Sequence, residues 1–233
     1  MNIDILYLAP FLSIAFSFFI TINILPKLIN KMVSSKICGI DVNKLNKPNI
    51  PEMGGMAGIL GFCLGLSLTI GIIKYFDYID VFPSLVAICV ICIASLIGLL
   101  DDISILGRKE KAYFISLASL PLIISQIGTE SIDFIYFRIS FVNEFKLFFW
   151  IILVPLGISG CANALNMSAG YNGLESGQLV VISLSLLLIS FIKDTEISFK
   201  LIYAAVLGSC LALYIFNKYP ARIFIGDIGT LGF

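Results

Sequence analysis

Long apolar runs, separated by short polar stretches, follow one another along most of the chain. A helix rises 1.5 Å per residue, so about 20 apolar residues are needed to cross the roughly 30 Å hydrocarbon core of a membrane. An eighth apolar run begins after Asp227, shortly before the sequence stops at Phe233. The pattern predicts an all-α, polytopic membrane bundle with seven complete spans and the start of an eighth. The seven spans are Ile3–Leu25, Met53–Ile73, Val81–Leu100, Ala112–Ile127, Leu147–Ala162, Leu179–Ile192 and Leu201–Phe216. The last four are short and are expected to need residues from their flanks.

Composition points to the same class of protein. Hydrophobic residues make up 59% of the chain and charged residues 13%, and the mean hydropathy of +1.02 lies outside the range of soluble globular proteins. The N-terminal segment has no basic residues ahead of an apolar run that is too long for a signal peptide, so we expect a retained first span. No repeat or low-complexity linker divides the sequence. Residues 1–233 are therefore predicted to form one membrane-embedded domain, truncated at its C-terminus.

The basic residues are distributed unevenly between alternate loops. The formal net charge is zero, so the total says nothing about an acidic partner. No nucleic-acid partner is expected. Ten of the 15 basic residues follow the first, third, fifth and seventh predicted spans, and five occupy the other loops. The positive-inside rule therefore predicts cytoplasmic odd-numbered loops and an outside N-terminus.

No Asp, Glu, Lys or Arg lies in the interior of any predicted span. Ion-coupled transporters usually keep such groups at membrane depth, so the pattern weakens a solute-transporter reading, although transporters also break helices with Gly and Asn near a binding site. The sequence contains no His, and the Cys89–Cys92 pair lies in a wholly apolar segment, where small apolar filler is favoured over a metal or redox site. The unusual polar residues instead gather in the predicted cytoplasmic loops.

An acid pair, Asp101–Asp102, ends the third predicted span, and Lys111 follows nine residues after Asp102. Two solvated acids at a membrane boundary would explain the pair alone. Together with the cations downstream, however, the pair suits a phosphate substrate, with Mg²⁺ shared between carboxylate and phosphate oxygens. Asp227, just ahead of the last apolar run, fits either a helix N-cap or a metal ligand, and Arg222 fits either a lipid headgroup or an anion contact.

The stretch SGCANALNMSAGYNGLESGQ, residues 159–178, contains four glycines and no Lys or Arg. Asn163 and Asn166 are spaced to share one helical face, and Asn172 and Gly173 follow. Amide oxygens can complete a Mg²⁺ shell, and glycines let backbone N–H groups approach a phosphate. A plain turn between spans is the simpler alternative, but the stretch is long for one. The first loop, with Lys44, is predicted to lie on anionic lipid or to gate the substrate.

Together these loops resemble the polyprenyl-phosphate N-acetylhexosamine-1-phosphate transferase family, and in particular its eukaryotic and archaeal branch, which acts on UDP-GlcNAc and dolichyl phosphate. The matching pieces occur in the family's order and span almost the whole chain, and the third is the most specific: DVNK…IPEMGG (41–55), LLDD (99–102) with Lys111, NALNMSAGYNGLESGQ (163–178) and N-x-x-P-x-R-x-F-x-G-D (217–227).

The resemblance implies a Mg²⁺-dependent transfer of GlcNAc-1-phosphate from UDP-GlcNAc to a polyprenyl phosphate, with release of UMP, as the first step of lipid-linked glycan assembly for N-glycosylation. Mn²⁺ could substitute for Mg²⁺, and a homodimer is left open as the oligomeric state. The catalytic or phosphate-contacting residues would be Asp101, Asp102 and Lys111, and the metal ligands Asn166 and Asp227. The substrate-binding residues would be Lys44, Glu52, Asn163, Asn172, Gly173, Leu174, Glu175 and Arg222, with the uridine side of the donor near Asn172–Glu175.

The chain departs from the family's pattern in three ways. Many bacterial relatives carry a third acid where this chain has Ile105, and they have Asp where it has Ala169 and Asn172, which favours the dolichol branch. The family also has a later cytoplasmic loop with His and Arg residues and about three further spans. We therefore expect the 233 residues alone not to form a competent enzyme. Another UDP-sugar, or undecaprenyl phosphate in cell-envelope synthesis, stays an alternative, and an archaeal plasma membrane is favoured over the endoplasmic reticulum.

Overall fold

The computed structural model describes residues 3–76, 79–104, 106–128, 131–133, 138–141 and 144–233. Their helices are α1 (Ile3–Ser34), α2 (Gly55–Phe76), α3 (Phe82–Ser104), α4 (Arg108–Leu117), α5 (Leu120–Ser125), α6 (Glu144–Phe148), a π-helical turn (Phe149–Leu153), α7 (Val154–Met167), α8 (Leu174–Ile192), α9 (Ile197–Asn217) and α10 (Asp227–Gly232). Two short antiparallel hairpins, which the apolar pattern did not predict, pair β1 (Cys38–Ile40) with β2 (Asn49–Pro51) and β3 (Ser131–Asp133) with β4 (Arg138–Ser140). The all-α membrane bundle is confirmed.

The core of the bundle forms where α1, α2 and α9 pack together. Phe62, Leu66 and Leu201 are completely buried in it. Small residues bring the backbones close: a Cβ added at Gly65 would collide with Ser17 of α1, and one added at Gly208 would collide with Ile14. Helices in lipid associate through such close packing, because the lipid removes most of the hydrophobic driving force between them.

Six helical segments in the described part of the chain are long and apolar enough to cross a membrane: Tyr7–Ser34, Gly55–Phe76, Phe82–Ser104, Phe145–Met167, Leu174–Ile192 and Ile197–Asn217. Each matches one predicted span, and the last three gain residues from their flanks as expected.

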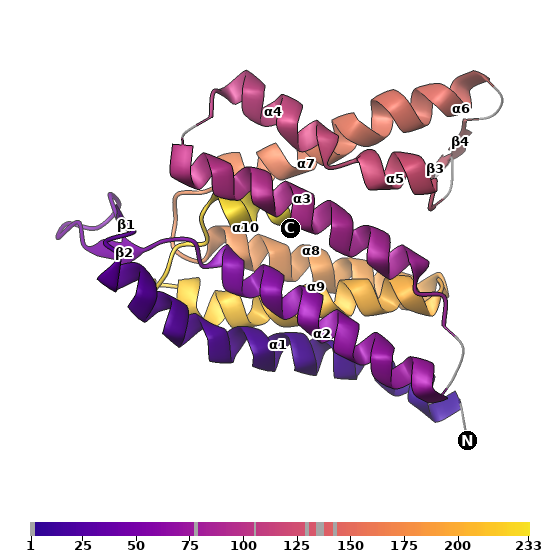
Figure 1. Ribbon diagram of the computed structural model, residues 1–233, viewed down its shortest axis with the longest axis horizontal. Coiled ribbons are helices and arrows are strands. Elements are labelled where there is room, and N and C mark those ends of the chain that lie inside the picture. Colours follow the sequence, from indigo (N-terminus) through magenta and orange to yellow (C-terminus); the bar gives the residue numbers. More distant parts are fainter. Residues whose placement is uncertain (1–2, 77–78, 105, 129–130, 134–137, 142–143) are drawn as a thin grey trace.

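The predicted span Ala112–Ile127 is broken instead into α4 and α5, which follow one another along the bundle (Figure 1). Pro121, in the first turn of α5, is the physical reason. Proline has no N–H to offer the carbonyl of Leu117, and its ring crowds that carbonyl, so the helix stops and restarts. Hydropathy alone does not register this break.

The polar connections that carry the sequence motifs gather at one end of the bundle (Figure 1). The β1–β2 hairpin, the α3–α4 turn, the α7–α8 loop and the α9–α10 loop all lie there. The last apolar run forms the short helix α10, which packs mainly against α3, α2 and α7. The prediction that all the unusual residues share one face therefore agrees with the fold.

Candidate active site

Side chains from four separated segments meet at this end of the bundle, around the ammonium group of Lys111 on α4. Lys111 forms ion pairs with Asp101 at the end of α3 and with Asp227 at the start of α10, the latter at 2.7 Å. The Oδ1 atom of Asn166, near the end of α7, lies 3.4 Å from the same Nζ. The Lys111 side chain is only 15% exposed and that of Asp101 only 4%. Three oxygen atoms thus converge on one sheltered positive charge.

Asn166 also ties α7 to α10. Its Nδ2 donates to Oδ1 of Asp227 at 2.7 Å and to the hydroxyl of Thr230, one turn further along α10, at 2.8 Å. This orientation of the amide leaves its oxygen directed at Lys111. The contact with Asp227 joins the two residues that the resemblance implied as metal ligands.

The two adjacent acids at the end of α3 have different partners. One oxygen of Asp101 accepts from the backbone N–H of Leu106 at 2.6 Å, while the other faces Lys111. Asp102 instead accepts from the backbone N–H groups of Asp227 and Ile228, at 2.8 and 3.0 Å. Successive helical residues point about 100° apart, so one pair of neighbours reaches both the lysine and the start of α10.

Burial and the proximity of other acids raise the pKa values of two acids that lie outside the spans, Asp227 and Glu52. Burial, and then sharing of a hydrogen bond with Asp101, raise the pKa of Asp227 above its ordinary value, although Lys111 and Asn166 act in the other direction. The pKa of Glu52 is raised by burial and by the negative charge of Asp227. Burial opposes the charge of Lys111, but its two carboxylate partners outweigh that cost and raise its pKa. The lysine therefore stays charged.

The donor set suits a hard divalent cation. Within the described residues, no group of three or more His, Cys, Asp or Glu side chains is placed to hold a metal ion. The oxygens around Lys111, however, combine two carboxylates with one neutral amide, and Mg²⁺ takes such ligands together with substrate phosphates. The Lys111 ammonium stands where these oxygens already converge. Asn166 and Asp227 therefore fit the metal-ligand role that remains a prediction.

A cavity of about 230 Å³ opens beside Asp227. Its walls come from three connections: the start of the β1–β2 loop, the α7–α8 loop and the segment before α10. Tyr171 and Phe224 contribute aromatic surface, and Glu175 and Asp227 contribute charge. The cavity combines an apolar pocket with a few polar groups, the usual composition of a small-molecule site.

Hydrogen bonds hold the walls of this cavity together. Asn172 donates from Nδ2 to Asp41 at 2.9 Å and accepts at Oδ1 from the backbone N–H of Ala221 at 3.0 Å. Asn43 donates to the carbonyl of Gly170. Asp41 is buried and also pairs with Lys44 at 3.0 Å. Asn172 and Asp41 thus connect three loops that are far apart in sequence.

The other predicted substrate-binding residues lie at varying distances from the acidic cluster. Glu175 lines the cavity and accepts from the N–H of Gly170 at 3.3 Å. Gly173 has a φ of +82° and donates its N–H to Asn217, whereas Leu174 lines a separate apolar cavity of about 710 Å³ between α7, α8 and α9. Neither residue is among those that line the cavity beside Asp227, and both line the larger apolar one.

Three further predicted residues have local partners. Lys44 lies over the ring of Tyr219, with its Nζ 5.1 Å from the ring centroid. Arg222 is exposed, stacks on Phe216 and donates to the carbonyl of Ile215. Asn163 donates to Ser159, one turn earlier on α7. The roles assigned to these residues, and to Glu52, stay predictions.

Sequence reasoning left out several residues that the fold brings into the site. Thr230 accepts a hydrogen bond from Asn166, and Asp41 accepts one from Asn172. Asn217 is almost fully buried, where its Oδ1 accepts from Gly173 and Ser176 and its Nδ2 donates to the carbonyl of Ile223. Asp41 and Asn217 are the first residues of two of the motifs that carry the family resemblance, and this position could have marked them as site residues. Thr230 had none, because it lies within an apolar run.

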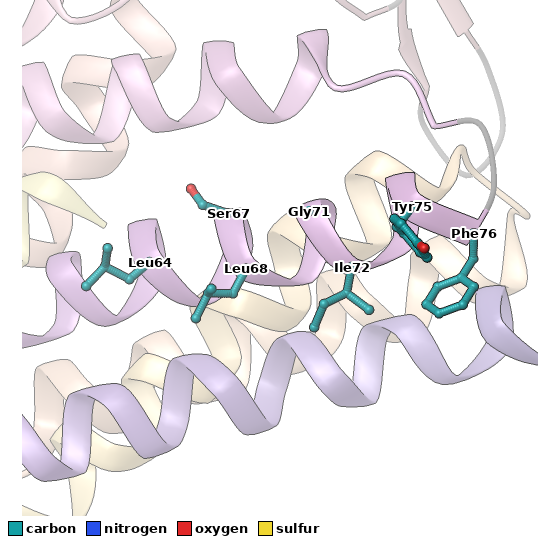
Figure 2. Close-up of a pocket in the computed structure, with 7 residues that line it drawn as sticks. All are labelled: Leu64, Ser67, Leu68, Gly71, Ile72, Tyr75 and Phe76. Atoms are coloured by element: carbon teal, nitrogen blue, oxygen red, sulfur yellow. The ribbon is translucent and has the colours of Figure 1, made fainter.

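A different kind of cavity, about 540 Å³ and almost wholly apolar, lies along the outer half of α2 (Figure 2). Its lining side chains come from successive turns of one helix, from Leu64 to Phe76. Since α2 begins near the motif-bearing end of the bundle and runs away from it, this groove lies apart from the acidic cluster. Among the residues that the structure describes, its lining contains no charged side chain, and its polar side chains are Ser67 and Tyr75.

The fold is that of a multi-pass membrane protein whose acidic and amide side chains gather around Lys111 at one end of its helices. Residues 84–233 match the family model described as glycosyl transferase family 4, and the chain belongs to this family.

Relatives with named activities extend the comparison. A putative UDP-N-acetylglucosamine–dolichyl-phosphate N-acetylglucosaminephosphotransferase of Saccharolobus solfataricus is 36% identical, over 96% of this chain and 67% of its own. The enzyme of the same name from Dictyostelium discoideum is 29% identical over 91% of this chain and 60% of its own. A phospho-N-acetylmuramoyl-pentapeptide-transferase of Prochlorococcus marinus is 32% identical over 80% and 53%. The chain thus spans between about half and two thirds of the length of these relatives.

Proposed function

We propose that the protein transfers GlcNAc-1-phosphate from UDP-GlcNAc to a polyprenyl phosphate of the dolichol type and releases UMP. The observation that carries this proposal is the convergence of Asp101, Asp227 and Asn166 on the position of one cation, beside the cavity that Asp227 lines. The names of the archaeal and Dictyostelium relatives support the choice of donor and acceptor. The product would begin a lipid-linked glycan for N-glycosylation.

The reaction needs positioning and charge neutralisation more than covalent chemistry by the protein. An oxygen of the acceptor phosphate attacks the β-phosphorus of the donor. The bond from that phosphorus to the bridging oxygen breaks, and its electron pair leaves with UMP. Lys111, freed from one carboxylate, would hold a phosphate oxygen of the donor or the lipid, and Asp101 would keep the lysine in place. The positive charge of Lys111 would neutralise part of the negative charge that spreads over the phosphoryl oxygens.

A divalent cation would be held by Asp227 and Asn166, whose oxygens already face one point. Mg²⁺, or Mn²⁺ in its place, would neutralise charge on the diphosphate of the donor and hold it in a fixed orientation. The uridine would occupy the cavity beside Asp227, against Phe224 and Tyr171. In this arrangement Asn172 shapes the nucleotide pocket by joining its walls.

A second donor class has one specific observation in its favour. The Prochlorococcus relative is named for transfer of a phospho-N-acetylmuramoyl-pentapeptide. The two candidates share the diphosphate chemistry and differ in the sugar. Comparison of UDP-GlcNAc with the muramoyl-pentapeptide donor on one membrane preparation separates them. A solute transporter, the alternative from another class, would release no UMP from either donor.

The direct test is UMP release by membranes that contain the full-length protein, supplied with UDP-GlcNAc and a polyprenyl phosphate. We expect UMP only when Mg²⁺ or Mn²⁺ is present. Asn166→Ala and Asp227→Ala should each lower the rate by about 100-fold or more, because each removes a charge-positioning group from the transition state. Asp194→Asn, at an exposed acid beyond α8, serves as the matched control and should keep wild-type activity. Full activity of either site variant would refute the metal assignment.

A further inference from the structure

We propose that Asp102 is a positioning residue that anchors the first turn of α10 to α3 and so sets the place of Asp227; this rests on the proposed function. The acid pair then divides into two roles. Asp101 faces the charge cluster through Lys111, whereas both oxygens of Asp102 are engaged by the backbone of residues 227 and 228. Asp102 therefore acts on the site through Asp227 and does not serve as the base for the acceptor.

The start of α10 needs such a partner because it cannot cap itself. The first N–H groups of any helix lack an acceptor within the helix. The N-cap residue is Gly226, which has no side chain, and no side-chain cap bond is made there. Asp102 supplies two acceptors from another helix, at 2.8 and 3.0 Å. Its negative charge also suits the positive end of α10.

Close packing shows that this contact fixes position as well as satisfying hydrogen bonds. Gly98 lies one turn before Asp102 on α3, and a Cβ there would be 2.7 Å from the Cα of Ile228 and closer still to the carbonyl oxygen of Asp227. Gly226 has a φ of +74°, and a Cβ there would be 2.9 Å from Oδ2 of Asp102. The backbones therefore meet with no side chain between them, so a small shift of α10 would move the Asp227 carboxylate directly.

The first experiment measures the anchor without metal or substrate. Amide hydrogen exchange of the metal-free full-length protein, followed by mass spectrometry on peptides covering residues 226–233, reports opening of the first turn of α10. Asp102→Ala should accelerate exchange there by about tenfold or more, and Asp101→Asn should leave it nearly unchanged. Asp102→Asn keeps one acceptor oxygen, so it should lie between the two. If Asp102→Ala does not purify as a folded protein, the Asn variant carries the test.

The second experiment follows the consequence at the metal position. Mn²⁺ binding, measured by electron paramagnetic resonance, should weaken about 10–100-fold in Asp102→Asn, as expected when a residue that orients a ligand is lost. UMP release at saturating Mg²⁺ should largely recover in the same variant. Unchanged exchange and Mn²⁺ affinity, together with turnover lost at every metal concentration, would overturn the proposal and make Asp102 a substrate-facing group. If wild-type membranes release no UMP, the proposed function fails, while exchange and Mn²⁺ binding still decide the role of Asp102.

Discussion

Lys111 illustrates how single residues obtain their meaning from partners that are distant in sequence. Its ion pair with Asp227 joins residues 116 positions apart, and the sequence around one residue does not indicate the other as its partner. The sequence did indicate the individual candidates, because acids, amides and a lysine are unusual at the ends of apolar runs. It could not indicate that Asp101 and Asp102 take different partners, since that depends on where α10 docks.

At the same scale, Glu52 should make stability depend on pH. Burial and the charge of Asp227 raise its pKa, so the folded state favours the protonated carboxyl. That stabilisation is complete below the unfolded pKa and is lost as the pH rises through the folded one. We therefore expect Glu52→Gln to raise the unfolding temperature at pH 7.5, with a gain that shrinks towards pH 5. Thermal unfolding in detergent measures both. A less stable variant at pH 7.5 would show that the carboxylate has a favourable partner.

Individual helices followed the hydropathy pattern closely except where backbone chemistry intervened. Most spans were predictable because about 20 apolar residues leave few alternatives in a membrane. The break between α4 and α5 depends on Pro121, whose missing N–H does not change hydropathy. The β1–β2 hairpin escaped prediction since its strands are only three residues long. The docking of α10 depends on glycines whose role becomes visible only when a neighbouring backbone is in place.

Two glycine substitutions test that docking. Gly98→Ala would push a methyl group into the backbone of α10, which cannot rotate away, and we expect a loss of about 1–3 kcal/mol of stability with a matching loss of activity. Gly71→Ala, on a face of α2 with nothing within 4 Å, should be tolerated. Unfolding temperature and UMP release, measured for both, check this. Equal behaviour of the two variants would contradict close contact between α3 and α10.

At the scale of the whole molecule, the loops that carry the sequence motifs lie together at one end of the bundle, as Figure 1 shows. The uneven distribution of basic residues predicts that this end faces the cytoplasm. Sequence could therefore indicate which loops share a face. The cavity could not be predicted, because its walls are joined by tertiary hydrogen bonds from Asn172 to Asp41 and to the backbone of Ala221.

Single-cysteine reporters test the orientation. In a variant without its six native cysteines, Lys193→Cys places an exposed thiol after α8, and Lys109→Cys places one near the motif-bearing end. A membrane-impermeant maleimide added to intact cells should label the first and spare the second, which should react only after the cells are opened. The reverse pattern would place the site outside and would remove its access to a cytoplasmic nucleotide sugar.

The dependence of the cluster on α10 also has a consequence for biosynthesis. Segments enter the membrane in the order of synthesis, and the partner that completes the cluster begins only at Asp227. Until that point has left the ribosome, Asp102 has no N–H groups of α10 to accept from, and Lys111 has only one of its two carboxylate partners, Asp101. A nascent chain that ends before residue 227 can therefore hold most of its helices in the membrane while the candidate site is still incomplete.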